Sequence, residues 1–246
     1  MTIAIGIDLG RYVMLAADTR TTYYSFLGRT FRDDSEKIQK TGIGLITGAG
    51  LLPLLDSVKR RLAKEEITDT GDIIRIVREE REKASVNFGP KVQEALRKTG
   101  WIFTYHTVLN GVPQLRLAVA HPELGNNIGL YGEKGPAIIY PIEANETQAK
   151  FISNSLLKEI RSNGEIAELQ ESIQYHARII AILIKALHEH FPSVSDYCQV
   201  GVHTAEGRKG ISPIIRGDER DVSFNLSRSS NANHSPEDID DVMPIS

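Results

Sequence analysis

Two apolar runs at the start of the chain alternate in the way expected of strands. Ile3, Ile5 and Ile7 alternate with smaller residues, and residues 12–17 form a second extended run. The turn Asp8-Leu9-Gly10-Arg11 separates them, so the pattern predicts a β-hairpin. Residues 21–32 are mixed in character, and we expect a loop there.

A third apolar run leads into the first helical pattern. Residues 43–47 predict a buried strand that ends in Gly48-Ala49-Gly50. Residues 51–64 then place apolar side chains three and four positions apart, which predicts a helix. The apolar residues of that helix are Leu52, Leu55, Val58 and Leu62.

The remaining pattern continues with paired elements of the same kind. Residues 71–98 predict a long charged helix with a break at Gly89-Pro90. The other expected elements are strands at 101–109 and 114–120 around an Asn110-Gly111 turn, helices near 146–163 and 165–190, and strands at 197–204 and 210–216.

This order predicts the class of fold. Helices come in pairs and strands come as hairpins, which argues for antiparallel sheets with segregated helical layers, an α+β architecture. Beyond residue 216 the chain becomes polar and then acidic. We expect one domain over residues 1–216 and a largely disordered tail over 217–246.

Composition excludes several classes of function. The formal net charge is −3, which disfavours a nucleic-acid protein that relies on overall basicity. No run reaches about 18 apolar residues, so we expect no membrane span. Cys198 is the one cysteine, which suits a reducing compartment, and we expect a cytoplasmic protein. No spacing of histidines or acidic residues predicts a metal site, and we expect no cofactor.

One candidate chemistry lies at the first turn. Ile5-Gly6-Ile7-Asp8-Leu9-Gly10 resembles the first phosphate motif of actin-like and sugar-kinase ATPases, although Arg11 follows where that family has Thr, Ser or Asn. Asp and Gly are also ordinary turn residues, so a plain hairpin turn explains the same letters. An ATPase built on Asp8 and Gly10 is a remote alternative.

A second candidate begins at Thr2. If Met1 is removed, Thr2 supplies a hydroxyl nucleophile and its own α-amine as a base. An α-amine has an unperturbed pKa near ~7.7–8.0, which suits proton transfer at neutral pH. Downstream the chain carries Ala17-Asp18-Thr19-Arg20, then Lys37-Ile38, then Gly48-Ala49-Gly50.

In this order and spacing the first 50 residues resemble proteasome β-subunits and their bacterial relatives, a family of N-terminal nucleophile hydrolases. We identify the chain as a divergent prokaryotic member. The resemblance implies a four-layer α-β-β-α sandwich, in which Thr2 is the nucleophile. It implies that Lys37 lowers the pKa of the Thr2 hydroxyl and amine, and that Asp18 pairs with Lys37 and orients it. Arg20 supports this site, although a strand-end ion pair between Asp18 and Arg20 explains the same motif.

The resemblance also assigns substrate contacts. The backbone N–H of Gly48 would stabilise the oxyanion, and Thr22 and Gly48 would bind substrate backbone as an added strand. Thr21, Ile46 and Gly50 match positions that line the family's specificity pocket, and they indicate a mid-sized pocket without a formal charge.

Two later elements of the family have imperfect counterparts. Asp196 and Gln199 match an Asp-x-x-Ser element that steadies the terminal amine, with Gln in place of Ser. Glu133 stands where the family has a serine between two glycines.

The function predicted from the sequence is amide hydrolysis of peptides by an N-terminal threonine. Transpeptidation on the same nucleophile and a non-catalytic assembly role remain alternatives. The resemblance implies a homo-oligomer acting on a peptide or protein, and leaves any ATPase partner unknown.

Overall fold

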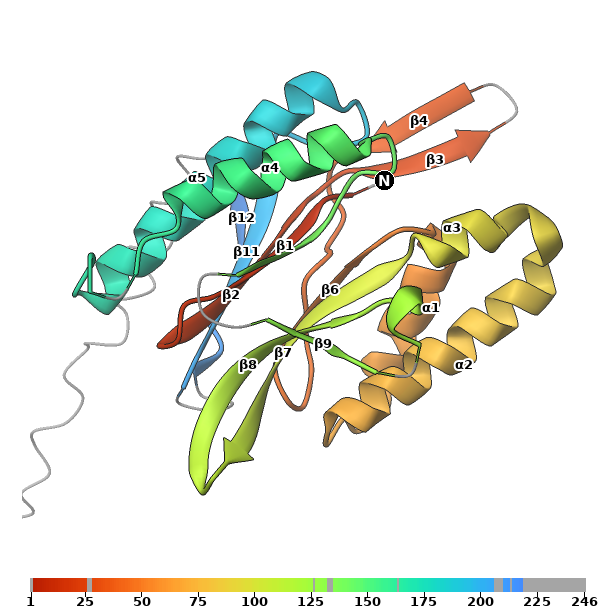
Figure 1. The fold of residues 1–246 in the computed structure, drawn as a ribbon. Coiled ribbons are helices and arrows are strands. Elements are labelled where there is room, and N and C mark those ends of the chain that lie inside the picture. Colours follow the sequence, from red (N-terminus) through yellow and green to blue (C-terminus); the bar gives the residue numbers. More distant parts are fainter. Residues whose placement is uncertain are drawn as a thin grey trace, which may run out of the picture.

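The computed structural model describes residues 2–25, 28–125, 127–131, 135–162, 164–205, 210–212 and 214–218. Within them the chain forms two five-stranded sheets, a separate two-stranded hairpin, and helices that lie in two groups (Figure 1). Every strand pair that the structure describes is antiparallel. The sequence-based expectation of antiparallel sheets and paired helices is confirmed at this level.

The first sheet is built on the N-terminal hairpin. Its strand order is β10-β1-β2-β11-β12. Cα pairing runs from Ala4 opposite Ala17 to Asp8 opposite Val13, so the expected hairpin is confirmed. The bounds are β1 Ala4–Asp8, β2 Tyr12–Asp18, β10 Pro136–Ile139, β11 Cys198–Thr204 and β12 Ile215–Gly217.

The second sheet has the order β5-β6-β7-β8-β9. Its longest pair turns at Asn110 and Gly111, which adopt φ of 52° and 78°. These left-handed values are those of the two-residue hairpin turn that Asn-Gly favours. The bounds are β5 Gln39–Lys40, β6 Leu45–Ala49, β7 Gly100–Leu109, β8 Val112–Ala120 and β9 Gly129–Tyr131.

Alternation along the strands divides the core. On β2, Val13, Leu15 and Ala17 join the cluster between the two sheets, while Met14 and Ala16 face the other way. Gly6 permits close approach of the sheets, because a Cβ there would lie 2.7 Å from Leu117 Cδ1. The period-two pattern in the sequence therefore reflects strands that are buried on both faces.

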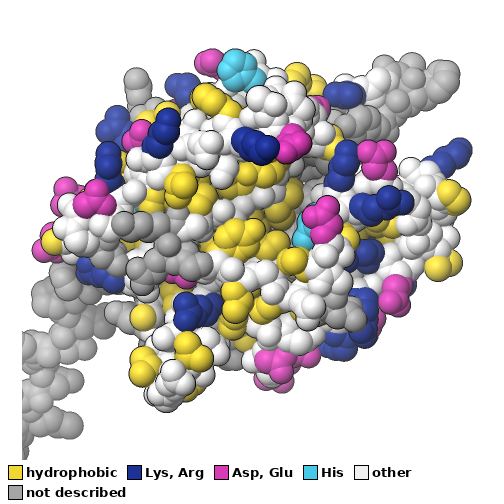
Figure 2. Space-filling model, viewed as in Figure 1, with side chains coloured by type: hydrophobic (Ala, Val, Ile, Leu, Met, Phe, Trp, Pro, Cys, Tyr) yellow, Lys and Arg dark blue, Asp and Glu magenta, His cyan; other side chains and the backbone are white. Residues whose placement is uncertain are grey.

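Each sheet carries helices on its outer face. Helices α4 (Glu146–Glu159) and α5 (Leu169–His190) pack on the first sheet, through a cluster that includes Ile152 and Ile180. Helices α1 (Leu52–Leu62) and α2 (Thr70–Phe88) pack on the second. The predicted break after α2 is confirmed, since short helices η1 (Gly89–Val92) and α3 (Gln93–Arg97) follow it. In Figure 2, charged side chains dominate the outer surfaces and hydrophobic ones gather in the middle of the face.

One expectation about secondary structure was wrong. Residues 21–32, expected to form a loop, contain strands β3 (Thr21–Ser25) and β4 (Gly28–Arg32), which pair with each other and with neither sheet. All of β4 is exposed, so no alternation of apolar residues marks it. In Figure 1 this hairpin projects beside the N-terminus.

The expected domain boundary needs a small correction. Gly217 belongs to β12, where it pairs with Cys198, so the ordered domain reaches at least into the segment assigned to the tail. Residues 219–246 lie outside the described residues. A short 3-10 turn, η2 (Pro122–Leu124), lies between β8 and β9. In the described parts of the chain, no helix has the length and apolar character needed to cross a membrane.

Candidate active site

The side chains of Thr2, Asp18 and Lys37 meet at the open end of the first sheet. Lys37 Nζ donates hydrogen bonds to Thr2 Oγ1 and to the carbonyl of Arg20, and lies 3.2 Å from Asp18 Oδ1. All three side chains are buried: the exposed fraction is 5% for Thr2, 0% for Asp18 and 5% for Lys37. The structure thus brings together the three residues that the sequence suggested as catalytic.

The N-terminal hairpin explains why two residues sixteen positions apart become neighbours. Because Ala4 pairs with Ala17, Asp18 lies across from Ile3, and the Ile3 N–H donates to Asp18 Oδ1 at 3.0 Å. Thr2 is therefore held at the end of β1 beside the end of β2. Lys37 arrives from an irregular segment between β4 and β5.

Asp18 is buried but well satisfied. Its Oδ2 accepts backbone N–H groups of Arg20 at 2.9 Å and Ser195 at 3.1 Å, in addition to the bond from Ile3 to Oδ1. Three backbone donors and one ammonium replace the water that the carboxylate loses. The site therefore contains a fixed negative charge that holds Lys37 in place.

Burial also sets the proton affinity of Lys37. Loss of water lowers the pKa of its amine from 10.5 to about 8, and attraction to Asp18 opposes that shift. An amine with a pKa near neutrality can exist in both protonation states at physiological pH. Lys37 is thus able to present a positive charge to the Thr2 oxygen and to exchange a proton there.

The side chain of Gln199 contacts the backbone on either side of Lys37. Its Oε1 accepts the backbone N–H groups of Lys37 at 2.7 Å and Ile38 at 3.2 Å, and its Nε2 donates to the carbonyl of Ser35. The side chain therefore fixes the backbone that carries Lys37. Its expected role beside a terminal amine stays a prediction.

The expected neighbours of Gln199 are also clarified. Asp196 is half-buried and contributes to the raised pKa of Arg20. Glu133 lies outside the described residues, so its expected position is untested. The backbone N–H of Ser195, which the sequence did not single out, reaches Asp18 instead.

Arg20 supports the adjacent hairpin. Its guanidinium binds both carboxylate oxygens of Asp33 at 2.6 Å, donates to the carbonyl of Pro192 and lies over the ring of Phe31. Only its backbone N–H reaches Asp18. The alternative reading, an ion pair between the Asp18 and Arg20 side chains, is therefore wrong.

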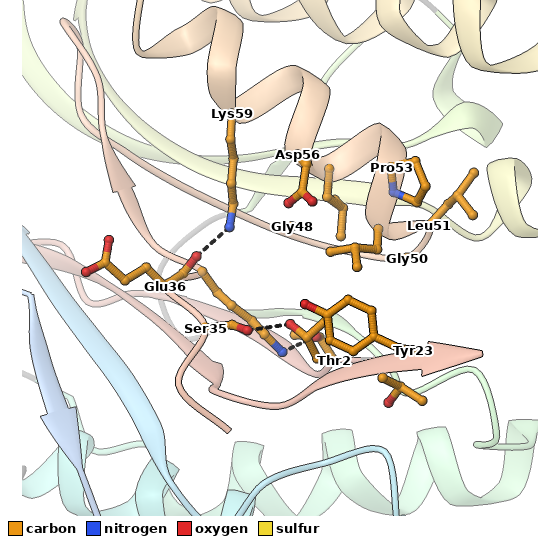
Figure 3. A pocket seen from close by; sticks show the side chains of 15 residues that line it. Thr2, Tyr23, Ser35, Glu36, Gly48, Gly50, Leu51, Pro53, Asp56 and Lys59 are labelled. Atoms are coloured by element: carbon orange, nitrogen blue, oxygen red, sulfur yellow. Dashed lines mark hydrogen bonds between the residues drawn. The ribbon is translucent and has the colours of Figure 1, made fainter. Parts of the chain in front are cut away.

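A cavity of about 400 Å³ opens above Thr2 and Lys37 (Figure 3). This is within the size range of small-molecule sites. Thr21, Thr22, Gly48 and Gly50 line it, as expected from the sequence.

Ile46 requires a correction. Its exposed fraction is 2%, and its side chain joins the cluster beneath α1 and α2 instead of the cavity wall. Along β6 successive side chains face opposite ways, so Leu45 and Ala49 point between the sheets and Ile46 toward the helices.

Sequence reasoning missed the charged side chains of the cavity. Asp56 and Lys59, both on α1, are part of its lining, as is Glu36. On α1, Leu52, Asp56 and Lys59 recur at spacings of four and three, which places these three residues on one face of the helix. That spacing could have revealed a polar face toward the cavity, but the sequence analysis considered only the apolar face of the same helix. The expected absence of a formal charge is therefore wrong.

The alternative site at Asp8 is an ordinary turn. Asp8 Oδ1 accepts the N–H of Gly10 at 2.9 Å, and Gly10 adopts φ of 73°. Its place is at the far end of β1 from Thr2, and the side chains that line the cavity do not include it. The geometry is that of a hairpin turn stabilised by its own aspartate.

Comparison with known sequences corrects the family assignment. No protein-family model matches the chain, and no curated protein matches it either. Membership of the proteasome β-subunit family, which the first 50 residues suggested, is therefore wrong as a sequence assignment.

Comparison of structures finds similar folds. Anbu (ancestral beta-subunit) from Yersinia bercovieri has a TM-score of 0.58 at 15% identity, with 96% of this chain and 98% of that chain covered. Anbu from Hyphomicrobium sp. strain MC1 has a TM-score of 0.56 at 19% identity, with 97% and 99% covered. A Gly-1 mutant of the latter gives 0.57 at 18%, covering 98% and 100%. The chain therefore shares the fold of these Anbu proteins along nearly its whole length.

Proposed function

We propose that this protein is an N-terminal threonine amidohydrolase that acts on peptides. The observation that carries the proposal is the hydrogen bond from Lys37 Nζ to Thr2 Oγ1, inside a buried cluster that opens onto a cavity. A hydroxyl held against a lysine of lowered pKa, with a fixed carboxylate behind it, is the arrangement of an activated nucleophile.

The proposed reaction begins once Met1 has been removed. Thr2 Oγ1 attacks the carbonyl carbon of the substrate, and the hydroxyl proton passes to the α-amine of Thr2. That proton then goes to the departing amine as the C–N bond breaks, which leaves an ester on Thr2. Water, deprotonated by the same α-amine, hydrolyses the ester and restores the hydroxyl. Lys37 stabilises the developing alkoxide throughout.

The substrate is proposed to bind as an extended strand. Thr22 on β3 and Gly48 on β6 both line the cavity, so they flank the space above Thr2. We assign Gly48 N–H to the oxyanion. A side chain at position 48 would crowd Leu55 Cδ2 and Trp101 Cδ1 at 2.9 Å, which supports a requirement for glycine there.

The proposal also covers the layer arrangement of the fold and the oligomeric state. We propose that the two sheets and their helices form a four-layer α-β-β-α sandwich that extends through β12 to Gly217, with the residues that follow as an accessory tail. The similarity to Anbu, named as an ancestral beta-subunit, supports a homo-oligomer. A cytoplasmic location stays a prediction, and any ATPase partner is unknown.

Two alternatives use the same residues. An amine in place of water would make the enzyme a transpeptidase, because both reactions share the ester on Thr2. A protein that retains Met1 would be a non-catalytic assembly subunit, since Thr2 would then lack a free amine.

The test is the intact mass of the protein before and after treatment with a peptide epoxyketone. This electrophile forms a ring with both the hydroxyl and the α-amine of an N-terminal threonine. We expect loss of Met1 and one adduct on Thr2, and no adduct in Thr2→Ala. Retention of Met1 in the purified protein, with no adduct, would contradict the proposal.

A further inference from the structure

The wall of the cavity opposite Thr2 is one face of helix α1. Leu52, Asp56 and Lys59 recur along it at spacings of four and three. In Figure 3, Asp56 extends from the helix toward the space above Thr2 and Tyr23. A charged group therefore faces the nucleophile across the cavity, at the place where a substrate side chain must lie.

The two lysines near Asp56 direct their hydrogen bonds to other groups. Lys59 Nζ donates to the carbonyl oxygen of Glu36 at 2.6 Å, and Lys37 is bound to Asp18 and Thr2. Burial lowers the pKa of Lys59, and attraction to Asp56 and Glu36 opposes that shift, so Lys59 interacts with Asp56 through space without a hydrogen bond or an ion pair between the two side chains.

Asp56 itself has room for a partner. Its side chain is exposed, and among the described residues none makes a hydrogen bond or an ion pair with its carboxylate. The carboxylate of Glu36, by contrast, extends away from the cavity in Figure 3. The negative charge available to a substrate is therefore that of Asp56.

The rest of this wall suits the stem of a long side chain. Leu52, Pro53 and Leu55 provide apolar surface between the helix and the cavity. Lysine and arginine bury their methylene groups along apolar surface while the charged end reaches a polar partner. A shorter acidic side chain would meet the same carboxylate with like charge.

We propose that Asp56 selects substrates that carry a lysine or arginine side chain next to the amide that is cleaved. The inference rests on the proposed function, since it places the reacting carbonyl at Thr2. Asp56 accepts a charge-assisted hydrogen bond from the substrate cation, which fixes that residue in the cavity.

The experiment combines turnover with binding. Turnover uses fluorogenic peptide amides that differ only in the residue before the cleaved bond: Arg, Leu or Glu. Binding uses acetylated tripeptides that end in the same three residues, measured by calorimetry, because these have no bond at the cleavage position. The variants are Asp56→Asn and, as a matched control, Glu82→Gln, which removes one exposed carboxylate from α2 outside the cavity.

We expect the wild type to prefer the Arg peptides over the Leu peptides by about tenfold in kcat/KM and in affinity. Asp56→Asn should lower kcat/KM and affinity for the Arg peptides about tenfold relative to those for the Leu peptides, which removes the preference, and Glu82→Gln should retain it. Turnover with no preference for Arg, or a preference that survives Asp56→Asn, would overturn the inference while leaving the proposed function intact.

The binding measurements separate the two proposals. Selective binding of the Arg tripeptide that depends on Asp56, without turnover or an adduct on Thr2, would uphold the role of Asp56 and contradict the proposed hydrolysis. Absence of binding and of turnover for all three residues would overturn both.

Discussion

Replacing Lys37 with alanine tests the site most directly. The change removes the only group that donates a side-chain hydrogen bond to Thr2 Oγ1 among the described residues. Loss of a positioned charge and proton carrier of this kind lowers turnover by about 10²–10⁴-fold. We expect an effect at the upper end, because Lys37 contacts both the nucleophile and the carboxylate behind it.

The same change should have a limited effect on stability. Breaking a buried ion pair costs about 3–5 kcal/mol when it leaves an isolated charge. Here Asp18 keeps three backbone N–H donors, and the lowered pKa of Lys37 shows that burial of its ammonium outweighs the attraction to Asp18. We therefore expect Lys37→Ala to lower the free energy of unfolding by only about 1–3 kcal/mol.

The assay measures the rate of epoxyketone labelling at Thr2 by intact mass, and stability by urea unfolding. Lys37 lines the cavity, so a small alkylamine added to Lys37→Ala has a path to the vacated position and should restore part of the labelling rate. Lys40→Ala, which removes an exposed lysine from β5, is the matched control.

The pH dependence gives an independent readout. Labelling by the wild type should rise as the α-amine of Thr2 becomes neutral, near its ordinary pKa of ~7.7–8.0, and should fall at higher pH as Lys37, with a pKa of about 8, loses its proton; the falling limb is the one that depends on Lys37. Stability should move the opposite way: between pH 8 and 10.5 the unfolded chain holds the lysine proton more tightly, so this residue's contribution favours the folded state as pH rises. A Lys37→Ala variant that labels within tenfold of the wild type, at unchanged pH dependence, would refute the reasoning.

Three further predictions concern the scaffold. Hydrogen bonds from Lys83, Ser57 and Arg61 hold the pKa of Glu80 at about 2, against the effect of burial. We expect Glu80→Gln to lower the free energy of unfolding by about 1–3 kcal/mol at pH 7. Urea unfolding at pH 7 and pH 2 should show that the difference from wild type vanishes as acid protonates Glu80. His176 accepts the N–H of Arg161 on Nε2, and burial lowers its pKa below 6.5; unfolding at pH 7.5 and 5.5 should show stability lost on acidification in wild type and less loss in His176→Gln. Gly50→Ala should lower stability by about 1–3 kcal/mol, because its Cβ would meet Thr99 at 2.2 Å, whereas Gly28→Ala, with open space around it, should cost less; equal changes in thermal midpoint would contradict this.

Local patterns carried much of the fold. Alternation over Ile3 to Ala17 and the Asn110-Gly111 dipeptide predicted hairpins that the structure contains, since turn chemistry and strand period act over a few residues. Hairpin β3–β4 was missed because its exposure removes the alternation that burial would impose. Register and burial direction were also out of reach, which is why Ile46 was misplaced.

The candidate site also contains some residues that local sequence patterns predict and others that they do not. The pairing of residues across the N-terminal hairpin places Thr2 beside Asp18, so their proximity could be predicted from the sequence. Lys37 was predicted only from the family resemblance. Gln199 and Ser195 contact this site from about 160 and 177 positions further along the chain, a proximity that no local pattern encodes. Asp56 could not be predicted from the sequence for another reason. A polar residue on an amphipathic helix ordinarily faces solvent, and only the packing of α1 shows that Asp56 lines the cavity.

The dependence of the site on Gln199 has a consequence for biosynthesis. The segment that carries Lys37 is held by Gln199 on β11, which is synthesised more than 150 residues after Lys37, and Asp18 accepts one of its hydrogen bonds from the backbone of Ser195. A nascent chain that still lacks these residues contains Thr2, Asp18 and Lys37, but it has neither the contacts that anchor the Lys37 backbone nor all of the hydrogen-bond donors to Asp18. Under the proposed function, Thr2 would therefore become reactive only after residues 195–199 have been synthesised and β11 has paired with β2.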